Sequence, residues 1–115
     1  GERHSLGFFG FAYYVENRDK LRAVAIAPGS DVSQAVEPTE ATIEGGEYVP
    51  LSRPLFIYVN NESLQRSEVA DFVRFYLSDR GQEQVAVKKY VRLNSDQIAD
   101  SRQRLEDALE GAAAD

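Results

Sequence analysis

The sequence contains no cysteine, no methionine and no tryptophan, and its single histidine is His4. Without cysteine the chain can form neither disulfides nor thiolate metal sites, and it has no cysteine nucleophile. A single imidazole also excludes multi-histidine metal sites. No pattern of partner residues surrounds His4, so we expect it to be incidental rather than catalytic or metal-binding. The lack of cysteine leaves the cellular compartment open.

The chain also lacks an initiating methionine, since it begins with Gly1 and Glu2. A complete translation product starts with methionine, so we expect a processed chain, a proteolytic piece or a cloned domain. The last residues are small and follow a helical pattern. We therefore expect 111–115 to be a disordered tail.

Basic residues are outnumbered, because 13 Lys and Arg stand against 19 Asp and Glu and give a net charge of −6. A non-specific nucleic-acid binder needs a basic face that displaces counterions, so the composition predicts no nucleic-acid partner. Long apolar runs are missing too. The uncharged stretch from Leu6 to Val15 is shorter than the ~20 residues that a membrane helix needs. Hydrophobic residues make up 43% of the chain, which suits a globular core.

Hydrophobic patterning predicts both strands and helices along the chain. We expect buried strands at 6–10 and 55–59 and a partly alternating strand at 21–26. A helix is predicted from Phe11 into the polar residues 16–20, and a short one at 39–46. Thr39 is the expected N-cap of that short helix, with Gly45 or Gly46 as its left-handed stop.

The best helical pattern starts at Ser67, the expected N-cap, and ends at Gly81, the expected stop. Its apolar stripe comprises Val69, Phe72, Val73, Tyr76 and Leu77. A second helical stretch follows at 82–88 and a short extended one at 89–93. Asn94 and Gln97 have capping-box spacing and open a last helix. That helix is predicted to turn Ile98, Leu105, Ala108 and Leu109 inward.

No pattern in the chain indicates catalysis or a metal site. Most carboxylates lie at predicted helix starts or on polar faces, which indicates solvated surface. The aromatic residues between Phe8 and Tyr14 favour a packed core over a stacking platform for bases or sugars. Arg53 lies between two prolines, where pairing with a carboxylate is favoured over binding an anion. Gly7 and Gly10 flank a turn whose N–H groups offer only a weak anion-site signal.

Two segments carry a family resemblance. Residues 5–17 (SLGFFGFAYYVEN) and 48–59 (YVPLSRPLFIYV) resemble the C-terminal third of the phosphate-binding protein of bacterial phosphate ABC transporters. Val69 to Leu77 looks like the family's long helix. Tyr90 to Leu93 is similar to its short closing segment, where a proline is more usual than Arg92. The resemblance extends from about Ser5 to Leu109.

The resemblance implies that the fold class is α/β and that the chain is a fragment of a two-lobe periplasmic binding protein of type II. Residues 1–47 would end one lobe, 48–54 would form the hinge or crossover connector, and 55–110 would close the other lobe. The implied hinge residues are Tyr48, Pro50, Leu51, Ser52 and Arg53. The family's phosphate ligands include a Ser-Gly-Thr segment that this sequence lacks, so the main ligands are expected upstream of Gly1. Ser5 and Gly7 are cleft-proximal by analogy only.

The implied function is capture of inorganic phosphate for uptake through an ABC transporter permease. It implies a periplasmic or extracytoplasmic location, with lipid anchoring of the parent left open, and neither catalysis, cofactor nor metal. Two alternatives stay open. One is an interaction or assembly module that self-associates, because a segment cut from a two-lobe protein leaves strand edges unpaired. The other is a binding protein or sensor for another oxyanion.

Overall fold

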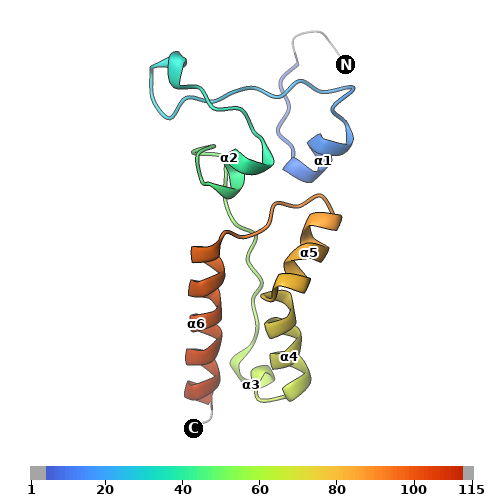
Figure 1. Ribbon diagram of the computed structural model, residues 1–115, viewed down its shortest axis with the longest axis vertical. Helices are drawn as coiled ribbons and strands as arrows, with labels where there is room; N and C mark the ends of the chain where they lie inside the picture. The colour runs from blue at the N-terminus through green and yellow to red at the C-terminus, as the bar shows by residue number, and fades with distance from the viewer. Residues whose placement is uncertain (1–4, 113–115) are drawn as a thin grey trace.

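The computed structural model describes residues 5–112, in which helices form two groups (Figure 1). The N-terminal part, residues 5–52, contains α1 (Phe11–Glu16), the 3-10 helix η1 (Val32–Gln34) and α2 (Glu40–Glu44). The C-terminal part, residues 60–112, contains α3 (Asn61–Leu64), α4 (Ser67–Tyr76), α5 (Asp79–Val87) and α6 (Ser95–Ala112). An extended segment, residues 53–59, leads from one part to the other.

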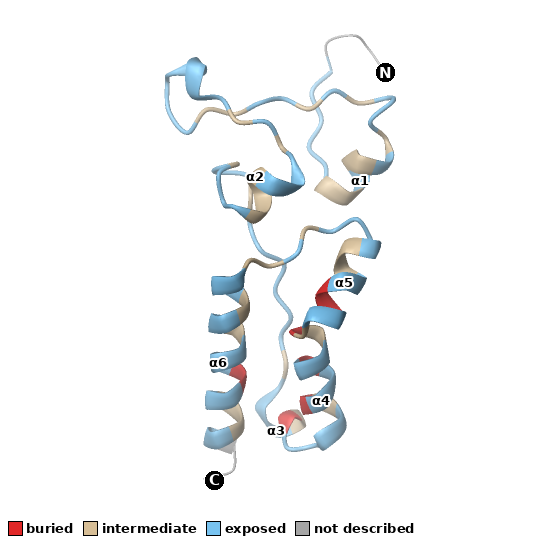
Figure 2. Ribbon diagram, in the orientation of Figure 1, coloured by how far each residue is buried: buried red, intermediate tan, exposed pale blue. Residues whose placement is uncertain are grey.

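The hydrophobic core lies entirely in the C-terminal part (Figure 2). Its buried cluster comprises Leu64, Val73, Leu77 and Leu105. Helices α3 and α6 pack together there, as do α4 with α5 and α3 with α4. The predicted stripe of α4 is confirmed except at Phe72, which is 64% exposed. Helix α6 turns its predicted residues inward, with Leu105 buried and Ile98, Ala108 and Leu109 packed around it.

The predicted single helix from Ser67 to Gly81 is two helices. Ser67 is the first residue of α4 rather than its cap, and Tyr76 is the last. Ser78 breaks the helix, because its Oγ accepts from the Gly81 amide at 3.2 Å and thereby caps α5. The predicted stop at Gly81 is wrong, since this residue is buried inside α5. Its lack of a side chain serves packing instead: a Cβ there would overlap the carbonyl oxygen of Phe75.

The caps predicted for the two other helices are confirmed. Thr39 caps α2 in a reciprocal capping box with Thr42, and Gly46 is left-handed at φ 74°. At the start of α6, the Gln97 amide donates to Asn94 Oδ1 at 2.9 Å and the Asn94 amide donates to Gln97 Oε1 at 3.0 Å. Both boxes satisfy N–H groups that a helix start leaves unpaired.

The predicted strands at 6–10, 21–26 and 55–59 are absent from the described residues, which form extended coil there. One antiparallel bridge, between Ile26 and Val36, is the sole β-pairing in this part of the chain. The physical reason is that a strand needs neighbouring strands to pair its backbone and cover its faces. No strand of the described chain pairs with 55–59, so Leu55 and Tyr58 are 70% and 92% exposed instead of buried, while Val59 packs against the core cluster.

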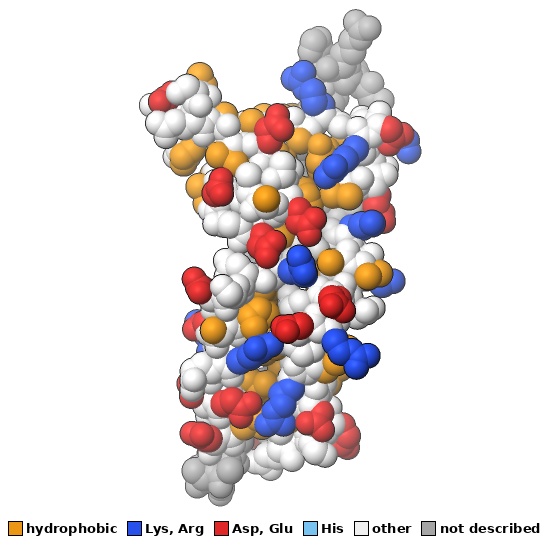
Figure 3. All heavy atoms as spheres, viewed as in Figure 1, with side chains coloured by type: hydrophobic (Ala, Val, Ile, Leu, Met, Phe, Trp, Pro, Cys, Tyr) orange, Lys and Arg blue, Asp and Glu red, His pale blue; other side chains and the backbone are white. Residues whose placement is uncertain are grey.

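The chain is far from compact. Its radius of gyration is 18.0 Å and its extents are 57 × 28 × 22 Å, whereas a compact domain of ~100 residues has a radius of about 13 Å. No described residue of the N-terminal part is buried (Figure 2). Apolar side chains reach the surface over that part and along the seam beside α6 (Figure 3). Contrary to the predicted tail, α6 continues through Gly111 and Ala112, while 113–115 lie outside the described residues.

The two helical glycines give a matched test of the packing between α4 and α5. Gly81→Ala should destabilise the chain by about 1–3 kcal/mol, because the added methyl overpacks against the end of α4. Gly111→Ala should be neutral or stabilising by less than about 1 kcal/mol, since nothing lies within 4 Å of the position that its Cβ would occupy. Urea unfolding followed by circular dichroism checks both. Equal changes in the free energy of unfolding for the two variants would contradict the close approach of Gly81 to the end of α4.

Candidate functional site

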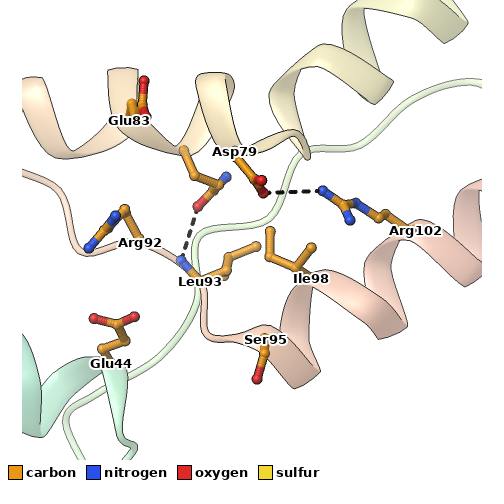
Figure 4. A pocket seen from close by; sticks show the side chains of 9 residues that line it. Glu44, Asp79, Glu83, Arg92, Leu93, Ser95, Ile98 and Arg102 are labelled. Atoms are coloured by element: carbon orange, nitrogen blue, oxygen red, sulfur yellow. Dashed lines mark hydrogen bonds and ion pairs between the residues drawn. The ribbon is translucent and has the colours of Figure 1, made fainter.

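An open cavity of about 400 Å³ lies where α2 meets the C-terminal part (Figure 4). Its wall combines residues of α2, α5, the loop 88–94 and α6. They are Glu44, Asp79, Gln82, Glu83, Arg92, Leu93, Ser95, Ile98 and Arg102. The lining therefore brings together three carboxylates and two guanidinium groups.

One of the two guanidinium groups is committed to structure. Arg102 donates to the carbonyl oxygen of Leu77 through Nη2 at 2.7 Å and Nε at 3.1 Å, which closes the end of α4. It also lies 3.7 Å from the Asp79 carboxylate. A cation at a helix C-terminus is favourable because it faces the negative end of the helix dipole. The charges of Asp79 and Arg102 therefore offset each other at one end of the cavity.

Arg92 is different, because it forms no hydrogen bond or ion pair with any described residue. In Figure 4 it lies at the opposite end of the cavity, between Glu83 and Glu44. Two carboxylates around one guanidinium leave this end negative. A phosphate would have to replace its lost hydration with fixed donors and positive charge. The cavity is thus poorly suited to an anion.

The predicted cleft-proximal residues do not line this cavity. Ser5 and Gly7 are exposed and precede α1. Gly10 forms the N-cap of α1 without a side-chain hydrogen bond. A Cβ on Gly7 would overlap the ring of Phe9, so its small size is used for local packing. The structure brings no charged donor to these residues within the described range.

The predicted hinge residues form a turn below α2. The Ser52 amide donates to the Tyr48 carbonyl at 3.0 Å, which encloses Pro50 and Leu51. The Tyr48 hydroxyl donates to the carbonyl of Val24 at 3.1 Å. Partial burial raises the pKa of this tyrosine above its ordinary value of 10.0. Tyr48 therefore ties the turn to the middle of the N-terminal part.

Arg53, the last of the predicted hinge residues, is exposed. The carboxylate partner expected for it is absent from the described residues. Its guanidinium is therefore available to solvent at the start of the extended segment 53–59.

The aromatic residues near the N-terminus do not form the predicted packed core. The rings of Phe9 and Tyr13 stack at 5.2 Å, yet both are about half exposed. Tyr14 lies 6.2 Å from the Phe11 ring and carries the guanidinium of Arg18 over its face at 5.5 Å. Contacts of this kind hold α1 together locally. They leave an apolar surface uncovered.

Asp31, like Tyr48, is an ionisable group within residues 5–112 whose pKa is shifted. No group of three metal-ligating side chains occurs among residues 5–112. Hydrogen bonds from Ser33 and Gln34 hold the pKa of Asp31 below its ordinary value, and these contacts cap η1. His4 lies outside the described residues. None of the described helices is long and apolar enough to cross a membrane.

Two bacterial proteins illustrate the sequence similarity of this chain to known proteins. The chain is 44% identical over 80 residues to the phosphate-binding protein PstS of Staphylococcus aureus, which is 69% of this chain and 24% of that protein. It is 42% identical over 80 residues to protein SphX of Synechococcus elongatus, covering 70% of this chain and 23% of that protein. No family model matches the chain.

A solved structure extends the similarity to the fold. The crystal structure of a possible phosphate-binding protein from Planctomyces limnophilus matches with a TM-score of 0.65 and 50% sequence identity. The match covers 88% of this chain and 35% of that structure. This chain therefore spans about a quarter of the length of the curated relatives that it matches.

The Tyr48 contact can be tested with a matched pair of tyrosines. Tyr48→Phe should lower the free energy of unfolding by about 0.5–1.5 kcal/mol through the lost hydrogen bond. Tyr58→Phe should have no effect, because Tyr58 is 92% exposed. Since the Tyr48 pKa is raised on folding, its contribution to stability is full below pH 10 and is lost as pH rises through the folded value.

Urea unfolding of both variants at pH 8, and at several values from pH 9 to pH 11, measures these effects. The loss of stability at alkaline pH should be smaller in Tyr48→Phe than in the unsubstituted chain. If the two variants behave alike, the bond between Tyr48 and Val24 does not stabilise the turn.

Proposed function

We propose that this chain is part of a solute-binding protein that captures inorganic phosphate. The reason is that it is homologous, over most of its length, to a segment of the bacterial phosphate-binding proteins. The agreement of sequence and fold with that one group of proteins carries the proposal. Uptake would proceed through an ABC transporter permease, so the parent would work in the periplasm or outside the cytoplasmic membrane. This function needs no catalytic step and no cofactor, since capture and release of phosphate are binding events.

The architecture that we propose for the parent is a two-lobe α/β fold of the type II periplasmic binding proteins. Residues 1–47 would end one lobe, 48–54 would form the crossover connector, and 55–110 would close the other lobe. The division of the described chain into two parts joined near Tyr48 and Arg53 supports this arrangement. So does the extended segment 53–59, whose apolar residues suit a strand covered on both faces.

The phosphate ligands themselves would come chiefly from residues of the parent outside these 115. A dehydrated oxyanion needs several fixed donors and preferably a guanidinium. Ser5 and Gly7 have no charged partner in the described chain, and the cavity beside Arg92 has an excess of carboxylates. We therefore assign Ser5 and Gly7 at most a place near the cleft. Closure of two lobes over the anion would then complete the site.

Calorimetry with inorganic phosphate tests the proposal on two proteins. The 115-residue chain should bind phosphate no tighter than about 1 mM, because it lacks most donors, whereas a full-length parent should bind tightly. Sulfate and arsenate serve as competing oxyanions. Tight binding by the 115 residues would contradict the placement of the ligands. A parent that prefers another oxyanion would support the alternative of a different binding protein or sensor.

A second candidate function is self-association, and the exposed segment 53–59 favours it. Leu55, Phe56 and Tyr58 are 70%, 68% and 92% exposed. No residue of this segment makes a backbone–backbone hydrogen bond found among the described residues. Such a strand-like stretch, which carries no charge from Pro54 to Val59, is a template for pairing with another chain. In the 115-residue chain the segment would thus pair with a second copy.

Light scattering with two matched substitutions tests this candidate. A charge on an edge strand opposes pairing, so Phe56→Lys should convert any dimer to monomer. Phe72→Lys is the control, because Phe72 has a similar exposure of 64% but lies on α4. A monomeric unsubstituted chain at high concentration, or equal effects of the two substitutions, would contradict pairing through the segment.

A further inference from the structure

We propose that Asn94 is a positioning residue that couples the two parts of the chain. Its side-chain Nδ2 donates to the carbonyl oxygen of Glu44 at 3.1 Å, across 50 residues of sequence. Between residues 5–52 and residues 66–112 of the described chain, no other hydrogen bond or ion pair is found. The three packed helix pairs include neither α1 nor α2. The bond therefore links the end of α2 directly to the start of α6.

Asn94 is held firmly to the C-terminal part. Its amide and its Oδ1 exchange hydrogen bonds with Gln97, and its carbonyl accepts from the Ile98 amide at 3.0 Å. The preceding Leu93 amide donates to Oε1 of Gln82 at 3.0 Å. Gln82 is buried, and its Nε2 donates to the Tyr76 carbonyl at 3.0 Å. The loop 88–94 is thus fixed to α4, α5 and α6 before it reaches α2.

The receiving carbonyl belongs to the last residue of α2. A helix leaves its final carbonyls without partners inside the helix. Residues that follow α2 satisfy the earlier carbonyls, since the Gly45 amide donates to Ala41 and the Tyr48 amide to Thr42. Asn94 satisfies the carbonyl of Glu44 from the other part of the chain. The Tyr48 hydroxyl donates to the Val24 carbonyl and so links the residues after α2 to the rest of the N-terminal part.

Substitutions of Asn94 can separate its role as the N-cap of α6 from its role in coupling the two parts. Asp, Ser and Asn serve about equally well as N-caps, because each offers a side-chain oxygen. Only Asn also provides an N–H donor that can reach Glu44. Asn94→Asp and Asn94→Ser should therefore keep the start of α6 and lose the coupling. Gln97→Ala is the control, because it removes only the acceptor of the Asn94 amide and leaves both the main-chain amide that Asn94 Oδ1 caps and the bond to Glu44.

Distance measurements between spin labels test the coupling without any ligand, so their outcome is independent of the proposed function. The chain has no native cysteine, and Glu40→Cys in α2 with Glu110→Cys in α6 labels two exposed positions. We expect a narrow distance distribution in the unsubstituted background and in Gln97→Ala. Asn94→Asp and Asn94→Ser should both broaden it, because the parts can then reorient. Distributions that stay narrow in both variants would overturn the proposal.

Hydrogen exchange separates lost coupling from unfolding. The Gly45 and Tyr48 amides should exchange roughly fivefold faster in both Asn94 variants, as expected for one lost hydrogen bond. The Ile98 amide should keep its protection there and in Gln97→Ala, because it donates to the main-chain carbonyl of Asn94. The Asn94 amide should lose its protection in Gln97→Ala, where its acceptor is removed. Faster exchange of Ile98 in Asn94→Asp and Asn94→Ser, with α2 unchanged, would make Asn94 a cap only and overturn the coupling.

Discussion

The contact of Leu105 with Leu64, Val73 and Leu77 is the interaction on which the described fold depends. It joins α6 to helices that precede it by roughly 30–40 residues, and it holds the buried cluster together. Burying one such side chain contributes on the order of 2 kcal/mol. A cluster of four therefore provides a modest margin against the entropy of ordering the chain. The N-terminal part has no buried cluster among its described residues, so its order relies on attachment to this one.

The extended segment 53–59 shows what such a small core cannot supply. Its composition favours a strand with apolar cover on both faces. Helices complete their backbone hydrogen bonds locally, whereas a strand completes them only with a neighbour. The segment thus stays solvated where no neighbour is within reach. The apolar composition of the segment thus suits a paired strand better than the extended coil that it forms.

Capping and periodicity rules predict most of the helices correctly. They predict poorly the features that depend on contacts between residues far apart in the sequence. The N-cap at Thr39 and the capping box of Asn94 with Gln97 depend on neighbouring side chains, so the sequence predicts both. The reciprocal bond from Thr42 to Thr39 is found only in the structure. The break at Ser78 was missed, although a serine followed by an acidic residue is an N-cap signal, because the apolar stripe extends across it. The stop assigned to Gly81 failed because glycine also serves close packing. Strand burial and the cavity depend on tertiary neighbours, which a single sequence does not specify.

The two arginines of the cavity illustrate why a charged lining is not by itself an anion site. Arg102 donates hydrogen bonds to the Leu77 carbonyl and forms an ion pair with Asp79. Arg92 keeps its donors, but Glu44 and Glu83 surround it (Figure 4). Moving a phosphate there would bring the anion toward two carboxylates with only one uncommitted cation in the lining, which costs free energy at the short distances of a cavity. The charges of this lining therefore disfavour an anion, while the Asn94 bond to Glu44 connects the two parts of the chain beside the cavity.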